Sequence, residues 1–269
     1  MRKNRDRYLP VKNKFIVSHL GAILWTAFSV YISSNWLHEL AGYVTYPIAF
    51  LIIAGIAYIP GYMSSFLVMS LILDKQPALK NVHPQGMVTL LIAAYNEADK
   101  IYQTLSYVNQ QDYDGQIKVL VVNNASTDET VDEVERARVD MDLDIKVLHE
   151  QKQGKFHALN YGLNHIHTEY VITLDADTVL HKSAVRYIVA RMESSPEDVC
   201  AVAGSVLAKN SRDNMLTKLQ EWDYFLGISS VKRLQGLYQG TLVAQGAFSI
   251  YKTSVVQEVE GWPDAIGED

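Results

Sequence analysis

The sequence contains a single cysteine, Cys200, in 269 residues. One thiol excludes an intrachain disulfide and gives no basis for a cysteine-based metal site. Cys200 stands at the start of a short apolar run that reads Val-Cys-Ala-Val-Ala, so we predict a buried thiol on a strand.

Two common nucleotide-binding signatures are also missing. No Gly-x-Gly-x-x-Gly follows a predicted strand, which argues against a dinucleotide-dependent enzyme of the usual type. The pair Gly154-Lys155 has no glycine five residues upstream and no Ser or Thr after the lysine, so a P-loop is not predicted. His165 and His167 lie at the end of a predicted helix, where a structural role is favoured over a zinc pair.

Positive charge is scarce outside the N-terminus. The formal net charge is −6, although residues 1–14 form a basic arm with six basic side chains against one acidic side chain. The rest of the chain is therefore strongly acidic. An acidic body argues against a nucleic-acid-binding surface, so no nucleic-acid partner is predicted.

Two long stretches lack charged side chains. Residues 15–34 are long enough to cross a bilayer core, and residues 43–73 form a longer second stretch in which a Pro-Gly pair predicts a kink or two shorter helices. Residues 35–40 are predicted as a short polar loop between them. A cleaved signal peptide is the alternative for the first stretch. The positive-inside rule keeps the basic arm, and hence everything after Lys75, in the cytoplasm.

After a polar linker, residues 76–86, short apolar runs alternate with helical patterns. We expect strands at residues 87–93, 117–123, 145–149, 170–174 and 199–203, and helices at residues 97–110, 126–138, 155–166 and 183–194. A capping-box match, Ser-Thr-Asp-Glu, opens the helix expected at residues 126–138. This alternation predicts an α/β fold with a mainly parallel sheet and helices on both faces, and ligands gather outside the carboxyl ends of such strands.

The strand predicted at residues 170–174 ends in Asp175-Ala176-Asp177. Two carboxylates one residue apart at a strand end can hold a hard divalent cation, because Mg²⁺ and Mn²⁺ favour oxygen ligands. An ordinary Asp-x-Asp turn is the alternative. Polar residues that end two other predicted strands, Tyr95 to Glu97 and Asn123-Asn124, are expected at the same edge of the sheet.

The order and spacing of these motifs resemble glycosyltransferase family 2, whose members are inverting enzymes with a GT-A fold. The resemblance is narrower to the membrane polysaccharide synthases of the poly-N-acetylglucosamine, hyaluronan, chitin and cellulose types. It covers residues 87–269 and implies a GT-A domain, incomplete at its C-terminus, that follows two transmembrane helices over residues 15–75. It also implies a multi-pass protein of the plasma membrane with a cytoplasmic catalytic domain.

The activity that this resemblance implies is transfer of a sugar similar to N-acetylglucosamine from a UDP-sugar to a growing β-linked polysaccharide. The implied cofactor is Mg²⁺ or Mn²⁺. The implied partners are a UDP-sugar donor, a polysaccharide or lipid acceptor, membrane lipid and an accessory membrane subunit. Donor-binding roles fall on Ala94, Tyr95, Asn96, Glu97, Asn124, Lys155 and Asp175.

Specific expectations attach to residues 94–97, to Asn124 with its neighbour Ala125, and to Lys155. Residues 94–97 would cradle uridine with Tyr95 near the base, although the same turn also fits a strand end at which Asn96 caps the next helix. Asn124 stands where the family usually has an acid that binds the uracil edge, and an amide can donate as well as accept a hydrogen bond. A glycine usual in the family is replaced by Ala125. Lys155 would neutralise diphosphate charge, with a solvated lysine at a helix start as the alternative.

The resemblance also assigns the metal and the chemistry. Asp177 is implied as the more direct metal ligand, with Asp175 near the ribose and the metal. The C-terminal Gly267-Glu268-Asp269 resembles the family's Thr-Glu-Asp motif, in which the final Asp is the general base. Inverting transfer needs one carboxylate to take the proton of the attacking hydroxyl while a metal stabilises the leaving diphosphate. Asp269 is the candidate base, and an ordinary solvated acidic pair is the alternative.

The acceptor side is implied by a Gly-Ala-Phe segment. Gln245, Gly246, Ala247 and Phe248 resemble residues that line the acceptor site, and a turn followed by a strand is the alternative. Before this segment, an apolar stripe runs at helical spacing through Leu216, Leu219, Trp222, Phe225 and Leu226. Core packing is its expected role, and a surface that faces the membrane or the acceptor is the alternative.

The synthases continue beyond the general base with a Gln-x-x-Arg-Trp motif and further membrane spans. Neither feature is found in these 269 residues. We therefore expect a fragment that binds nucleotide sugar but polymerises poorly. Two other functions stay open. One is a non-processive transferase that forms a glycolipid, and the other is an inactive membrane partner of an intact synthase.

Overall fold

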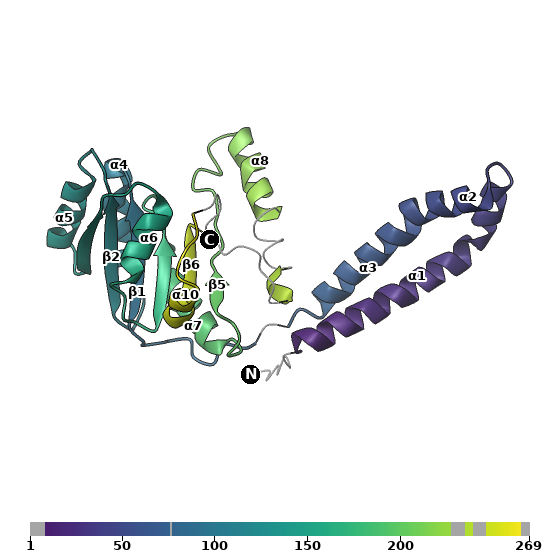
Figure 1. The fold of residues 1–269 in the computed structure, drawn as a ribbon, viewed down its shortest axis with the longest axis horizontal. Coiled ribbons are helices and arrows are strands. Elements are labelled where there is room, and N and C mark those ends of the chain that lie inside the picture. The colour runs from purple at the N-terminus through teal and green to yellow at the C-terminus, as the bar shows by residue number, and fades with distance from the viewer. Residues whose placement is uncertain (1–8, 76, 227–234, 239–245, 265–269) are drawn as a thin grey trace. The chain divides into compact units, whose positions relative to one another are not determined.

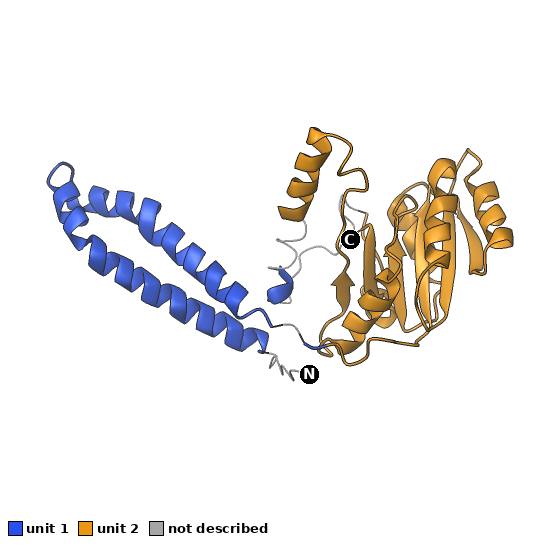
Figure 2. Ribbon diagram, turned by 180° about the vertical axis from the view of Figure 1, so that it is seen from behind, with its two compact units in different colours: residues 1–78, 233–240 blue, residues 79–232, 241–269 orange. Residues whose placement is uncertain are grey.

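A computed structural model of the chain describes residues 9–75, 77–226, 235–238 and 246–264. The chain forms two compact units (Figure 2). One unit consists of residues 1–78 and 233–240, and the other of residues 79–232 and 241–269. Each unit is described below by itself.

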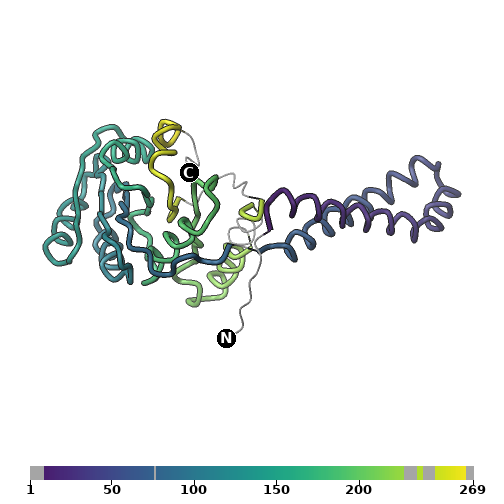
Figure 3. The backbone as a smooth tube through the Cα atoms, turned by 90° about the horizontal axis from the view of Figure 1, so that it is seen from below, coloured from purple at the N-terminus to yellow at the C-terminus, as the bar shows by residue number. Residues whose placement is uncertain are grey.

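The first unit is a helical hairpin, in which α1 (Val11–Ala41) runs beside the returning helices in both Figures 1 and 3. The returning arm comprises α2 (Tyr46–Ile53), the π-helical turn η1 (Ala54–Tyr58) and α3 (Ile59–Ile72). Both arms are long and apolar enough to cross a membrane by length and composition. Their large apolar side chains are mostly exposed, as at Leu24 (71%) and Ile56 (74%).

One detail of this hairpin differs from the sequence-based expectation, and another agrees with it. The polar loop predicted at residues 35–40 is part of α1, which continues to Ala41. No Gly or Pro interrupts that segment, so nothing ends the helix before Gly42. The Pro60-Gly61 pair predicted a kink or two shorter helices, and the returning arm consists of two α-helices, α2 and α3, joined by the π-helical turn η1 directly before Pro60. Proline lacks an N–H and its ring crowds the preceding turn, which a π-helical turn relieves.

A short segment, residues 235–238, packs against this hairpin within the first unit. The Tyr238 ring stacks on Phe66 with centroids 5.7 Å apart, and its hydroxyl shares a hydrogen bond with Ser70 Oγ. Leu237 in the same segment is fully buried. These contacts tie a late part of the sequence to the ends of α1 and α3.

The second unit is built on a six-stranded sheet with the order β3-β2-β1-β4-β6-β5 (Figure 1). Its strands are β1 (Val88–Ala94), β2 (Ile117–Asn124), β3 (Asp144–Glu150), β4 (Tyr170–Leu174), β5 (Ala201–Ala203) and β6 (Phe248–Lys252). The first four are mutually parallel, and β6 runs antiparallel to both β4 and β5. The predicted mainly parallel sheet is confirmed, with β6 as an antiparallel addition.

Helices cover both faces of this sheet, as predicted. On one face, α4 (Ala98–Asn109), α5 (Thr130–Asp140) and α7 (Ala184–Ser194) share a core with strand residues such as Leu90 and Ile172. On the other face, α6 (Lys155–Leu163) and α10 (Thr253–Glu258) pack on alternate strand residues such as Leu91 and Val171. Because both faces are covered, the central strands β1 and β4 are apolar runs rather than alternating ones.

Three local expectations in this unit are wrong. The helix expected from Ser126 begins at Thr130, because the Ser126 hydroxyl accepts a hydrogen bond from the Asn96 N–H instead of capping its own helix. Cys200 is exposed, since the short edge strand β5 begins after it at Ala201.

The apolar stripe on α8 (Met215–Tyr224) is also not core. Leu216, Leu219 and Trp222 are 75%, 56% and 63% exposed, whereas Thr217 is buried. Thr217 closes a capping box with Asn214 at the start of the helix, and the apolar stripe is exposed in this structure.

Candidate functional site

The carboxyl ends of β1, β2 and β4 meet at a cavity of about 490 Å³. It is lined by Ala93, Ala94, Tyr95, Glu97, Asn124, Gln153, Gly154, Lys155, Asp175, Ala176 and Asp177. The set includes every donor-site and metal residue expected from the sequence except Asn96. Residues that span more than 80 positions of the sequence thus converge at one edge of the sheet, because parallel strands end there together.

The two aspartates follow β4 and are fixed by hydrogen bonds to their backbone. The Thr104 hydroxyl on α4 donates to the carbonyl of Ala176, between the two aspartates, at 2.8 Å. Thr104 is 1% exposed and Ala176 is 5% exposed, so this bond is buried. On the other side, the Asp175 N–H donates to the carbonyl of Ala247 at 3.2 Å. The loop that carries both carboxylates is therefore held from α4 and from the segment before β6.

Two lysines face the two aspartates. Lys155, the first residue of α6, places Nζ 2.9 Å from Asp175 Oδ1. Lys100 on α4 places Nζ 3.6 Å from Asp177 Oδ2 and 3.8 Å from Glu97 Oε2. Lys155 was predicted from the sequence, whereas Lys100 was not. The only signal for Lys100 was its position one helical turn after Glu97.

The carboxylates repel one another electrostatically, which shows in the pKa of Glu97. Burial raises this pKa above its usual value; the ammonium of Lys100 opposes the shift, and the neighbouring acidic side chains add to it. A divalent cation would relieve the same repulsion. Among the described residues, no group of three or more His, Cys, Asp or Glu side chains is arranged to hold a metal.

The donor set still fits a hard cation that shares its ligands with a substrate. Asp175 and Asp177 supply two carboxylates, and Mg²⁺ and Mn²⁺ are commonly bound by one or two carboxylates plus phosphate oxygens and water. The two lysines beside them would meet the negative charge of such phosphates.

Asn96 lies behind the cavity and joins two turns. Its backbone has φ 54°, a left-handed conformation that asparagine tolerates better than most residues. The Asn96 Oδ1 accepts a hydrogen bond from the Thr127 N–H at 2.8 Å, and Ser126 Oγ accepts from the Asn96 N–H at 3.1 Å. The turn after β1 is thereby tied to the turn after β2. Asn96 therefore holds these turns in place and does not line the cavity.

Asp128 adds a second tie between the same turns. Its carboxylate accepts hydrogen bonds from the backbone N–H groups of Ala98 and Thr130, each at 3.1 Å. Burial alone would raise the pKa of Asp128, but these bonds and that from the Thr130 hydroxyl outweigh it and lower the pKa. The ionised form thus anchors the start of both α4 and α5.

The segment expected to line an acceptor site is partly described. Gly246, Ala247 and Phe248 lead into β6, and Phe248 is 7% exposed. Gln245 and Asp269 lie outside the described residues. Phe248 and Asp177 both line a second, more apolar hollow of about 590 Å³, which also includes Tyr187, Ile188 and Leu207. This hollow therefore borders the first cavity at Asp177.

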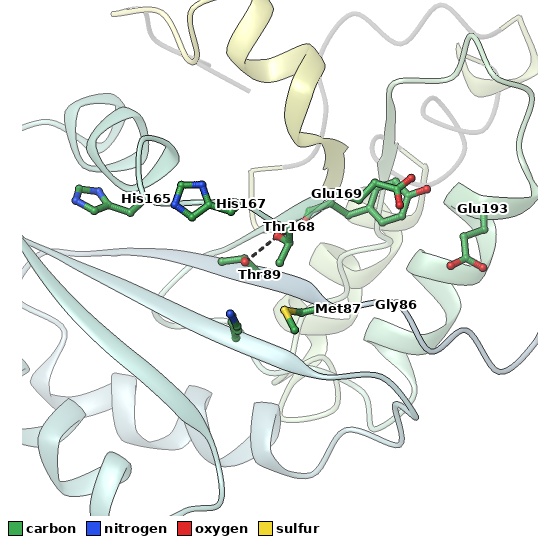
Figure 4. Close-up of a pocket in the computed structure, with 10 residues that line it drawn as sticks. Gly86, Met87, Thr89, His165, His167, Thr168, Glu169 and Glu193 are labelled. Atoms are coloured by element: carbon green, nitrogen blue, oxygen red, sulfur yellow. Dashed lines mark hydrogen bonds between the residues drawn. The ribbon is translucent and has the colours of Figure 1, made fainter.

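A third cavity, of about 490 Å³, lies at the opposite edge of the sheet, where the strands begin (Figure 4). Thr89 and Thr168 share a hydrogen bond of 2.8 Å there, and His165, His167 and Glu193 are arrayed around it. His165, two residues after α6 ends, places Nδ1 2.9 Å from the carbonyl of Tyr161 in that helix. This contact gives His165 a structural role, and the absence of a zinc pair stays a prediction.

Comparison with known proteins gives the family. The model of the family described as Glycosyl transferase family 2 matches residues 89–260. A poly-beta-1,6-N-acetyl-D-glucosamine synthase of Staphylococcus aureus (strain MSSA476) is 33% identical over 198 residues, covering 73% of this chain and 47% of that protein. The synthase of the same name from Staphylococcus epidermidis (strain ATCC 35984) is 30% identical over 220 residues, covering 81% of this chain and 52% of that protein. The chain thus spans about half the length of these curated relatives.

A solved structure supports the fold. A mannosyltransferase from Pyrobaculum calidifontis, in complex with GDP-Man and Mn²⁺, is similar with a TM-score of 0.58 and 21% identity. The similarity covers 97% of this chain and 61% of that one. At this identity the likeness concerns the fold, which agrees with the GT-A type expected from the sequence.

Proposed function

Because this chain belongs to glycosyl transferase family 2, we propose that it is part of a membrane-bound inverting glycosyltransferase. The donor is a UDP-sugar, the transferred sugar resembles N-acetylglucosamine, and the acceptor is a growing β-linked polysaccharide. The observation that carries the proposal is the meeting of Asp175, Asp177 and Lys155 in one cavity beside Tyr95. The named relatives, which are poly-N-acetylglucosamine synthases, support the choice of sugar.

In this proposal each residue of the cavity has a distinct task. Asp177 and Asp175 hold Mg²⁺ or Mn²⁺, which supplies positive charge to the leaving diphosphate. Lys155, supported by Lys100, meets the remaining phosphate charge. Tyr95, 48% exposed at the rim, offers its ring to the nucleobase. Asp269 takes the proton of the attacking hydroxyl as the general base.

Location follows from the first unit. The two apolar helices and the named relatives support membrane association. We place residues 1–14 and the second unit in the cytoplasm, with two membrane spans over residues 15–75 and a linker over residues 76–86. The catalytic domain, residues 87–269, then has access to cytoplasmic nucleotide sugars and, at the membrane surface, to a lipid or a growing polysaccharide.

Calorimetry with the full chain in lipid nanodiscs tests donor binding. We expect UDP to bind in the presence of Mn²⁺ and the affinity to fall on the order of tenfold or more in Asp177→Asn, because one ligand charge is lost. Asp132→Asn, which makes the same change on the exposed face of α5, is the matched control and should leave binding unchanged. Metal-independent binding, or equal binding by both variants, would remove the basis of the proposal.

A second candidate is a transferase that adds a single sugar to a lipid. It is favoured by the apolar hollow that borders the donor cavity at Asp177, since Ile188, Leu207 and Phe248 could contact an alkyl chain. Radiolabelled sugar transfer followed by solvent partition and product sizing separates the two candidates. Long water-soluble product supports the synthase, and one labelled sugar in the organic phase supports the lipid transferase. No incorporation in the presence of metal and acceptor supports an inactive partner of another synthase.

A further inference from the structure

The side chain of Asn124 is engaged with a loop rather than open to the cavity that it lines. Asn124 ends β2 and is 4% exposed. Its Nδ2 donates to the carbonyl of Lys152 at 2.7 Å and points toward the carbonyl of Glu150 at 3.5 Å. Its Oδ1 accepts a hydrogen bond from the Gly154 N–H at 2.8 Å. One carboxamide thus holds both ends of the loop 150–154.

Only a carboxamide satisfies this arrangement. A carboxylate accepts hydrogen bonds and cannot donate them. An aspartate at position 124 would therefore keep the bond from Gly154 but would set a charged oxygen against the carbonyl of Lys152, which needs a donor. Lys152 is itself exposed, but a carboxylate at position 124 would be buried with the Gly154 N–H as its donor and with two carbonyls beside it, and burying a charge in such surroundings is costly.

The loop that Asn124 holds leads directly to the phosphate side of the cavity. Gly154 has φ 133°, a conformation open to glycine, and the next residue, Lys155, begins α6. Lys155 Nζ reaches Asp175 at 2.9 Å. The carboxamide of Asn124, the backbone of Gly154 and the ammonium of Lys155 thus form one connected path from the end of β2 to the metal carboxylates.

We infer that Asn124 is a positioning residue that sets Lys155 through the loop 150–154, and that it does not select the nucleobase. This inference rests on the proposed function only in that the cavity takes a nucleoside diphosphate. It departs from the base-binding role that the sequence resemblance implied for this position. The carboxamide has its two N–H hydrogens directed at the loop, so the loop geometry depends on it.

Hydrogen exchange of the full chain without nucleotide tests the first half of the inference. Peptides covering residues 150–158 should exchange faster in Asn124→Asp and Asn124→Ala than in the unmodified chain, because the loop loses its anchor. Asn123→Asp is the matched control. Its Oδ1 keeps the hydrogen bond from the Ser126 N–H at 3.2 Å, and the contact that it changes, between Nδ2 and His149 Nδ1 at 3.4 Å, lies outside the loop 150–154. Unchanged exchange at residues 150–158 in both Asn124 variants would overturn the inference, whether or not the chain binds nucleotide.

Nucleotide binding tests the second half. With Mn²⁺ present, Asn124→Asp should lower the affinity for UDP, CDP and GDP by the same factor, on the order of tenfold. The factor is the same because Lys155 contacts the diphosphate that all three share. In a Lys155→Met background the same substitution should have no further effect, because residues that act in series are not additive. Asn123→Asp should bind all three as the unmodified chain does.

Several results would overturn the inference without touching the proposed function. One is tighter and more selective UDP binding in Asn124→Asp, as expected of a residue that reads the uracil edge. Another is a loss of nucleotide affinity in Asn124→Asp that adds fully to the loss caused by Lys155→Met. If the unmodified chain bound no nucleoside diphosphate with metal, the proposed function would fail, and the exchange measurement would still decide whether Asn124 holds the loop.

Discussion

Replacing Thr104 by valine should weaken the binding of metal and nucleotide although Thr104 touches neither. Its hydroxyl donates a 2.8 Å hydrogen bond to the carbonyl of Ala176, between the proposed metal ligands Asp175 and Asp177. Valine matches threonine in shape but cannot donate, so the buried carbonyl loses this donor. Such a loss costs about 1–3 kcal/mol of unfolding free energy. For a unit of this size, the unfolding midpoint should fall by about 2–12 °C.

The effect on binding follows from the same bond. Without it, the loop 175–177 can relax to find another donor for the Ala176 carbonyl. Metal binding must then restore the original positions of the two carboxylates, and the free energy of this rearrangement weakens binding. If the whole of the about 1–3 kcal/mol appears there, affinity falls by about 5- to 150-fold.

The Thr89→Val variant is the matched control for this experiment. Thr89 is 5% exposed, and its hydroxyl shares a 2.8 Å hydrogen bond with Thr168 at the opposite edge of the sheet (Figure 4). It should lower the unfolding midpoint by a similar amount and leave the calorimetric affinity for UDP and Mn²⁺ unchanged. If Thr104→Val destabilises the protein but binds as tightly as Thr89→Val, the Thr104 bond supports the fold without positioning the carboxylates, and the reasoning is refuted.

Three more predictions follow from single positions. Protonation of Glu97, whose pKa is raised, should compete with cation binding, so Mn²⁺ affinity should fall as the pH drops through that raised pKa and fall less in Glu97→Gln. Glu193→Gln, at the far cavity, should keep the full pH dependence of Mn²⁺ affinity. Ala125→Gly should raise the unfolding free energy by about 0.5–1 kcal/mol, measured by urea denaturation, because φ is 56° there. Gly261→Ala should lower the unfolding midpoint, because φ is 88° and its Cβ would lie 2.1 Å from Asn160 Oδ1.

The sequence predicted the sheet well where strands are buried runs bounded by turn residues. The strand at residues 170–174 coincides with β4, because five apolar or β-branched residues stand between Glu169 and the turn at Asp175. The same logic placed the ends of β1 and β2, and hence the convergence of Tyr95, Asn124 and Asp175. These residues converge because neighbouring parallel strands end at a common edge of the sheet.

What the sequence did not predict depends on partners that are distant in the chain. Asn124 reaches a loop 26 to 30 residues away, and Thr104 reaches Ala176 across 72 residues. Their residue types say only that a polar group is present, and the partner follows from helix phase and sheet packing. The same is true of Lys100, whose reach to Asp177 depends on how α4 is rotated against β4.

The apolar patterns failed for a related reason. The stripe on α8 has the spacing of a core helix, but spacing says that one face is apolar and not what that face meets. Leu216 and Trp222 are exposed in this structure, whereas a similar stripe on α4 (Ile101, Leu105 and Val108) is buried against the sheet. Two helices with one kind of pattern therefore have opposite surroundings.

The charges of the cavity lead to one further conclusion about how it works. Lys155 pairs with Asp175 and Lys100 with Asp177, so each carboxylate already has a cationic neighbour. A cation alone would have to displace the lysines, and a diphosphate alone would have to displace the aspartates. When both bind, the cation takes the carboxylates while the diphosphate takes the lysines, and no charge in the cavity loses its partner. The two ligands should therefore favour each other's binding, and linkage requires the gain in affinity to be the same in both directions.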